Sequence, residues 1–253
     1  MRDILPKIIL TLIIGIFVAP MIFFVFWIFD YQAALERPEQ IIEAGGTENT
    51  KVSESKDVIL IEPSKAEVRN IGVIFYPGGK IEASAYVPLM TMIAEKGYPA
   101  IIAKMPYRLA VFDIDKAKHI QKYFAEEIEW ALAGHSLGGA MAAEFTRDEP
   151  DLTAGLILVA AYPGTETNIS SLSVPTFIIA GSNDPKSNIS KIKDRLNLLP
   201  ENTRMEIIQG ANHSQFGYYK PHKDDGKAGI SREKQHKKTA ELIINMLTEI
   251  ETP

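Results

Sequence analysis

The feature that most constrains the fold is a glycine-rich stretch, Gly134-His135-Ser136-Leu137-Gly138-Gly139. Residues 128–133 before it are strand-like, and residues 137–147 after it are rich in alanine, with apolar residues at helical spacing. A glycine–x–serine–x–glycine pattern in this context predicts a sharp turn with Ser136 at its apex, because only small neighbours let strand and helix pass so closely. Ser136 is therefore a candidate nucleophile, and the alternative is an ordinary helix-capping serine.

Strand-like and helix-like segments alternate from about Lys56 onward, which predicts an α/β fold. Apolar runs on both strand faces favour a mostly parallel, doubly wound sheet with helices on both faces. The segment between Tyr162 and Val174 is too short for a large helical cap domain. The predicted strands are 58–61, 71–76, 100–103, 128–133, 156–160, 176–180 and 205–208, and the predicted helices are 85–96, 115–124, 137–147 and 231–251.

The N-terminal region contains a run of 22 uncharged residues, Ile8 to Phe29. At about 1.5 Å per residue such a helix spans roughly 33 Å, enough to cross a bilayer. A cleavable signal peptide is the competing interpretation, but its apolar core is normally shorter, and no small–x–small cleavage site follows Phe29. We therefore expect a transmembrane signal anchor over residues 1–29, a tether over 30–55 with a short helix near 33–42, and an α/β domain over 56–253.

The charges that flank this run predict an orientation. Arg2, Lys7 and the amino terminus precede it, whereas the residues that follow it are mostly acidic. The positive-inside rule then favours a cytoplasmic N-terminus and an extracytoplasmic domain. The whole chain has a formal charge of −5 and no basic stripe, so nucleic acid is not expected as a partner. The chain has no cysteine, which excludes disulfides, thiolate metal sites and a cysteine nucleophile.

Three polar side chains follow predicted strands in the order serine, acid, histidine. Ser136 follows 128–133, Asp184 follows 176–180, and His213 follows 205–208. The carboxyl ends of parallel strands meet at one edge of a sheet. A serine hydroxyl becomes a good nucleophile when an imidazole removes its proton, and a carboxylate orients that imidazole. The sequence thus predicts a catalytic triad, although Asp184, in an Asn-Asp-Pro context, has the alternative of organising its turn.

The other histidines are expected to lie outside this site. His119 and His236 fall on polar helical segments and should be solvated, and His135 is the variable residue of the serine turn. His222 lies in a charged loop with Asp224 and Asp225, for which a metal site is a weak alternative. We otherwise expect no metal site and no organic cofactor.

A second glycine-rich segment, Tyr76-Pro77-Gly78-Gly79-Lys80, follows the predicted strand 71–76. Paired glycines at this position allow backbone N–H groups to face a pocket. Together with the N–H of Leu137 they would form an oxyanion hole. The alternative is a plain glycine turn.

These motifs resemble the α/β-hydrolase superfamily, and in particular its compact dienelactone-hydrolase-like branch, whose members often carry a Phe-Tyr-Pro-Gly-Gly segment like residues 75–79. The resemblance covers residues 58 to 253 and implies Ser136 as nucleophile, Asp184 as acid and His213 as base. It also implies oxyanion donors at Leu137 and Gly79. Dienelactone hydrolases proper use a cysteine nucleophile, so their substrate is not carried over, and Pro77 stands where many esterases have histidine.

The sequence therefore predicts a membrane-anchored serine hydrolase that cleaves carboxylic esters through an acyl-enzyme. A thioesterase, amidase or acyltransferase would use the same triad, and a non-catalytic binding module with this fold is the alternative from another class. We expect Tyr107, Arg108 and Phe216 to line an open pocket for a small-molecule or lipid-like ester.

Overall fold

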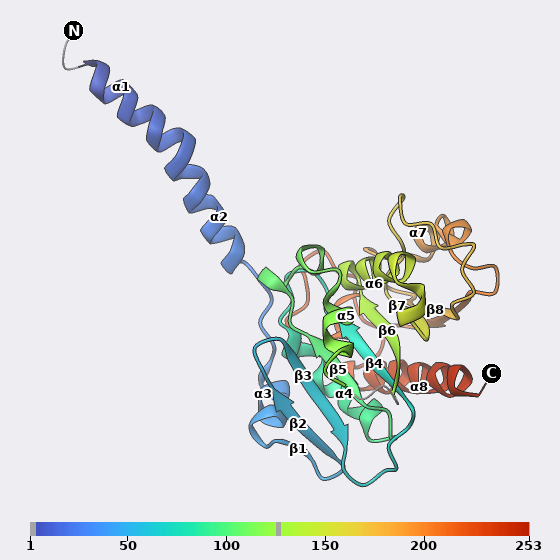
Figure 1. Cartoon of the computed structure of the whole chain (residues 1–253). Coiled ribbons are helices and arrows are strands. Elements are labelled where there is room, and N and C mark those ends of the chain that lie inside the picture. The colour runs from blue at the N-terminus through green and yellow to red at the C-terminus, as the bar shows by residue number, and fades with distance from the viewer. Residues whose placement is uncertain (1–3, 125–127, 253) are drawn as a thin grey trace. The chain divides into compact units, whose positions relative to one another are not determined.

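The computed structural model describes residues 4–124 and 128–252 (Figure 1). The chain divides into two units, with the boundary in the sequence between Tyr31 and Gln32. Unit 1 is helical: α1 (Ile4–Ile13) and α2 (Ala19–Phe29) are joined by one turn of π-helix over Ile14–Val18. The wider turn precedes Pro20, whose ring would clash with a carbonyl four residues earlier in a regular helix. Leu10–Phe29 has a mean hydropathy of 2.8 and is long and apolar enough to cross a membrane, criteria that a signal sequence also meets.

Unit 2 is built on one sheet, in which the described strands lie in the order β1-β2-β3-β5-β4-β6-β7-β8-β9. The strands from β5 to β9 run parallel, whereas β1, β2 and β3 add an antiparallel edge. The expected mostly parallel α/β sheet is confirmed. The strand bounds are β1 Gly46–Thr47, β2 Thr50–Glu54, β3 Val58–Pro63, β4 Ile71–Tyr76, β5 Ala100–Ala103, β6 Glu129–His135, β7 Gly155–Val159, β8 Thr176–Gly181 and β9 Arg204–Ile208.

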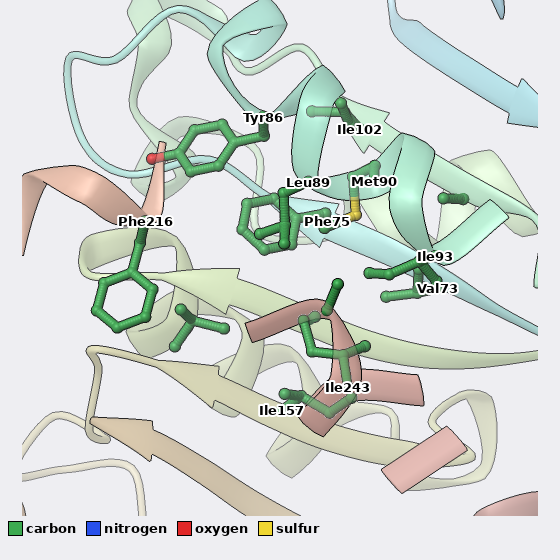
Figure 2. Close-up of a cluster of buried hydrophobic side chains, with 14 of the residues drawn as sticks. Val73, Phe75, Tyr86, Leu89, Met90, Ile93, Ile102, Ile157, Phe216 and Ile243 are labelled. Atoms are coloured by element: carbon green, nitrogen blue, oxygen red, sulfur yellow. The ribbon is translucent and has the colours of Figure 1, made fainter. Parts of the chain in front are cut away.

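Helices cover both faces of this sheet because its central strands are apolar on both sides. In β4 every residue is buried, and alternate side chains enter different cores. Val73 and Phe75 pack with α4 and α8, as Figure 2 shows for Leu89, Met90, Ile93 and Ile243. Ile74 and Tyr76 pack on the other face with α5, α6 and α7. The helix bounds are α3 Glu36–Glu43, α4 Val87–Ala94, α5 Lys116–Gln121, α6 Leu137–Asp148, α7 Ile189–Lys193 and α8 Arg232–Glu251.

The segment expected to be a tether, residues 30–55, is instead largely part of unit 2. Strand β2 pairs with β3 over five residues, from Thr50 opposite Pro63 to Glu54 opposite Ile59. Val52 is buried, and Ile41 and Ile42 of α3 pack against the same core. The charged residues that indicated a linker lie on the exposed face of β2, which is next to the short edge strand β1, and on the exposed face of the short helix α3.

The parallel strands end in register. Tyr76 lies opposite Gly134, and His135 lies opposite Val159. Gly181 lies opposite Ile208 at the far side of the sheet. The loops that follow these strands therefore start from one edge of the sheet, where ligands bind in open α/β folds.

Candidate active site

Ser136 occupies the turn between β6 and α6 with a strained backbone, φ 53° and ψ −122°. An L-residue with positive φ in this region costs about 1–3 kcal/mol and persists only when its surroundings impose it. Its N–H donates to the Val159 carbonyl at 3.0 Å, which ties the turn to β7. The hydroxyl makes no cap hydrogen bond to α6. The alternative of an ordinary capping serine is therefore wrong.

The glycines around Ser136 allow strand, helix and the neighbouring loop to pack closely. A Cβ on Gly134 would lie 2.5 Å from the Gly138 carbonyl carbon, and a Cβ on Gly138 would lie 2.2 Å from the Tyr76 carbonyl oxygen. Both contacts are with backbone atoms, which cannot rotate away. The pattern of small residues thus serves close packing, as the sequence predicts.

Asp184 and His213 form a buried hydrogen-bonded pair. The His213 Nδ1 to Asp184 Oδ2 distance is 2.7 Å, and both side chains are nearly inaccessible to solvent. The other carboxylate oxygen, Oδ1, accepts the N–H groups of Lys186 at 2.8 Å and Ser187 at 2.9 Å. Because an ionised carboxylate only accepts hydrogen bonds, Nδ1 carries the proton and Nε2 of a neutral imidazole is left as an acceptor.

The histidine also lies beside the serine turn. The ring of His213 is 4.6 Å, centroid to centroid, from the ring of His135, the residue directly before Ser136. The structure therefore brings Ser136, Asp184 and His213 to one edge of the sheet, from three different strand ends. Ser136 itself is only half-buried, so solvent reaches part of this residue.

Two residues that sequence reasoning missed hold the backbone of the histidine loop. Asp225 accepts the N–H of His213 at 3.2 Å and that of Ser214 at 2.7 Å. Gln235 of α8 accepts the Asn212 N–H at 3.2 Å and donates to the Asn212 carbonyl at 2.8 Å. The charged residues of the 222–225 loop were a sequence signal for a functional group here, but the Asp225 carboxylate binds backbone N–H groups. Among the described residues, no group of three or more potential ligands is placed to hold a metal ion.

His135 couples the serine turn to the glycine-rich loop after β4. The Gly78 N–H donates to the Tyr86 hydroxyl at 3.0 Å, and that hydroxyl lies 2.8 Å from His135 Nδ1. The Tyr86 hydroxyl therefore links the glycine-rich loop to the residue directly before Ser136. Complete burial lowers the pKa of His135 well below its usual range, so the imidazole is neutral in this role.

Gly79 and Leu137, the two expected oxyanion donors, are neighbours in the structure. A Cβ on Gly79 would lie 2.8 Å from Leu137 Cδ2, so the two residues are in contact. Within the described chain neither N–H group has a protein acceptor, in contrast to that of Gly78. Two neighbouring residues thus each have a free N–H group within the described chain, at the edge of the sheet that carries Ser136.

The residues expected to line the substrate pocket differ in their surroundings. Tyr107 is 50% exposed and, like Arg108, has a positive φ. The Arg108 carbonyl accepts the Lys80 N–H at 2.8 Å, so this loop contacts the glycine-rich loop. Phe216 is completely buried in the cluster of Figure 2, and its ring centroid is 5.8 Å from that of His135. Phe216 thus packs behind the site and offers no surface to a substrate.

His236 corrects another expectation, because it is buried rather than solvated. It lies on α8 with its ring edge-on to Tyr218, and neither ring nitrogen has a hydrogen-bond partner within the described chain. Desolvation, with a smaller contribution from the charge of Arg232, lowers the pKa of His236 to about 4. The sequence around it is polar because Lys234 and Lys237 face water, whereas Gln235 is polar but buried like His236.

This burial predicts an acid-sensitive fold. Above pH 6.5, the ordinary value, His236 is neutral in both the folded and unfolded states and contributes nothing. As the pH falls from 6.5 towards 4, the unfolded chain takes up a proton that the folded chain excludes, so the free energy of unfolding falls, by about 3 kcal/mol at most. Urea titrations between pH 7 and 4.5 should show a flatter pH dependence for His236→Leu than for wild type. Parallel curves for the two proteins would contradict the prediction.

Comparison with known proteins assigns the chain to a family. Residues 72–237 match the model of the alpha/beta hydrolase family. A CIB-like hydrolase from Thermoplasma acidophilum superposes with a TM-score of 0.58 at 18% identity, covering 78% of this chain and 99% of that one. An alpha-beta serine hydrolase homologue from Coxiella burnetii gives 0.55 at 16% identity, covering 79% and 98%. No curated protein matches the sequence. The matched region contains Ser136, Asp184 and His213, and the chain belongs to the α/β-hydrolase family.

Proposed function

We propose that this hydrolase cleaves carboxylic esters through a covalent acyl-enzyme, with Ser136 as nucleophile, His213 as base and Asp184 as the group that orients His213. The observation that carries the proposal is the 2.7 Å hydrogen bond between Asp184 and His213 Nδ1 at the edge of the sheet that presents Ser136. That bond leaves Nε2 unprotonated, the state a general base requires.

In the proposed reaction, Nε2 of His213 takes the Ser136 proton as Oγ attacks the ester carbonyl. The carbonyl oxygen becomes an oxyanion. The N–H groups of Leu137 and Gly79, which have no acceptor in the part of the chain that the structure describes, are the proposed donors to it. His213 then gives its proton to the departing alcohol. Water, deprotonated by the same imidazole, attacks the acyl-enzyme and releases the acid and Ser136.

The same chemistry would serve a thioesterase, an amidase or an acyltransferase, which differ only in leaving group or acceptor. A panel of acyl esters, thioesters and amides of graded chain length, each assayed with and without an added alcohol as acyl acceptor, separates these activities.

An active-site probe tests the proposed function directly. A fluorophosphonate should label the wild-type protein at Ser136, and Ser136→Ala should remove the labelling completely, because the phosphonate bonds only to an activated hydroxyl. Ser171→Ala, at an exposed serine outside the site, is the matched control and should label like wild type. Folded wild-type protein that resists labelling, or equal labelling of Ser136→Ala, would refute the proposal.

We also propose that the apolar helix Leu10–Phe29 anchors the enzyme in a membrane, with the N-terminus in the cytoplasm and unit 2 on the other side. The support is its length and hydropathy, together with the basic residues before it and the acidic residues after it. A reporter fused after Pro253 should be active only outside the cytoplasm; activity confined to the cytoplasm would reverse the orientation.

A further inference from the structure

The loop after β5 exposes a cluster of large apolar side chains, Tyr107, Val111 and Phe112, which we name the β5-loop patch. They are 50%, 43% and 54% exposed, and the Tyr107 and Phe112 rings contact edge-to-face at a centroid distance of 5.7 Å. Isolated exposed apolar residues are ordinary on proteins, but a contiguous group marks an interaction surface.

The backbone of this loop is held in an unfavourable conformation. Tyr107 and Arg108 have φ values of 51° and 59°, in the left-handed region that non-glycine residues avoid. Two successive residues of this kind persist only where neighbouring contacts impose them. Contacts around the loop therefore hold Tyr107 in its exposed position.

The patch borders the proposed oxyanion donors. The Lys80 N–H donates to the Arg108 carbonyl at 2.8 Å, and Lys80 directly follows Gly79. Leu109 Cδ2 would lie 3.4 Å from a Cβ on Gly79. Whatever surface the β5-loop patch contacts is therefore also close to the site that would attack a substrate.

The first residue of unit 2 also lies beside the glycine-rich loop that contacts the β5-loop patch. The first residue of the unit, Gln32, donates its N–H to the Lys80 carbonyl at 2.7 Å and accepts the Glu82 N–H at 3.0 Å. In the sequence only Asp30 and Tyr31 separate Gln32 from Phe29, the last residue of the apolar helix. Three residues of fully extended chain reach about 11 Å at most, so an anchored chain must bring Lys80 close to the membrane surface.

We propose that the β5-loop patch inserts into the lipid surface and that the enzyme acts on acyl esters carried by bilayer lipids. This inference rests on the proposed ester hydrolysis and membrane anchor. The apolar rings would lie among the acyl chains, and the neighbouring Gly79 and Ser136 would meet an ester at headgroup level. Apolar surface buried in the lipid stabilises the docked state and so favours a substrate that stays in the bilayer.

Insertion is tested on the full chain reconstituted in phosphatidylcholine vesicles. The chain has no cysteine, so Val111→Cys and Val68→Cys each offer one site for an environment-sensitive dye. Val68 is the matched control, because it is 52% exposed but precedes β4, at the opposite end of that strand. A lipid-borne quencher should quench the dye at position 111 and not at position 68. Equal quenching at the two positions, or none at position 111, overturns the proposal.

Substrate class is tested with two esters, a water-soluble short-chain p-nitrophenyl ester and 4-methylumbelliferyl oleate embedded in the same vesicles. The variant Val111→Ser/Phe112→Ser should hydrolyse the soluble ester within about twofold of wild type but the embedded ester at least about tenfold more slowly, a loss of about 1.4 kcal/mol. Val68→Ser should match wild type on both esters. If the variant loses activity equally on both esters, or if the wild type hydrolyses only the soluble ester, the lipid-substrate inference alone is overturned. If the wild-type protein is inactive on both esters and is not labelled by fluorophosphonate, the proposed function is overturned as well.

Discussion

Asp184→Asn is expected to lower kcat for ester hydrolysis by about 10⁴-fold. The asparagine carbonyl can still accept the N–H groups of Lys186 and Ser187, so its amide NH₂ would face His213 Nδ1. That NH₂ donates where the carboxylate accepted, which forces the imidazole proton onto Nε2. The histidine then has no lone pair for the Ser136 proton, although the protein around it is unchanged.

Asp225→Asn is the informative comparison, because Asp225 also contacts His213 but only through the backbone. One of its two acceptor oxygens would become an NH₂ opposite an N–H, which is expected to cost about 1–3 kcal/mol of stability. Its kcat should fall far less than that of Asp184→Asn. Steady-state kinetics and urea titrations of both variants separate the two effects, and an Asp184→Asn enzyme that kept more than about a tenth of the wild-type kcat would refute the proposed role of Asp184.

Gly138→Ala is expected to destabilise the fold by about 3 kcal/mol or more. The added Cβ would lie 2.2 Å from the Tyr76 carbonyl oxygen and 2.3 Å from that of Pro77. Real Cβ atoms do not approach so closely, and neither carbonyl can rotate away, so α6 must move from the end of β4. That movement would also separate Leu137 from Gly79, and labelling by fluorophosphonate should fall with stability.

Gly164→Ala provides the control for this substitution. Its added Cβ would meet only the Thr167 hydroxyl, at 3.5 Å, an ordinary contact. We expect its free energy of unfolding to stay within about 0.5 kcal/mol of wild type. Chemical denaturation of the three proteins measures the difference, and equal stability of Gly138→Ala and Gly164→Ala would show that the helix can shift without cost.

Local sequence predicted the sheet and its elements well. The strands at 71–76 and 100–103 have the predicted bounds, and the others differ by at most two residues at either end. Those two strands, β4 and β5, lie in the middle of the sheet, where a buried strand must be apolar on both faces. The order of Ser136, Asp184 and His213 at strand ends was also readable, because parallel strands bring their carboxyl ends to one edge.

Residues whose surroundings come from distant parts of the chain were not predictable. The charged residues in 50–54 led to the prediction of a linker, yet this segment is a strand because it pairs with β3. His236 lies among polar residues in sequence but faces the interior, since only the packing of α8 on the sheet decides which side of the helix is buried. Asp225 and Gln235 contact the histidine loop through hydrogen bonds that no short pattern encodes.

The sequence by itself therefore determined which elements form and which strand ends carry a serine, a carboxylate and a histidine, because both depend on periodicity and on turn residues. Only the tertiary structure decided how those groups act together. It aligned Asp184 with His213 Nδ1, made His135 a neutral link between two loops, and left the N–H groups of Gly79 and Leu137 without acceptors among the described residues. These properties are distances between segments far apart in the chain, and they exist only once the sheet has brought the segments together.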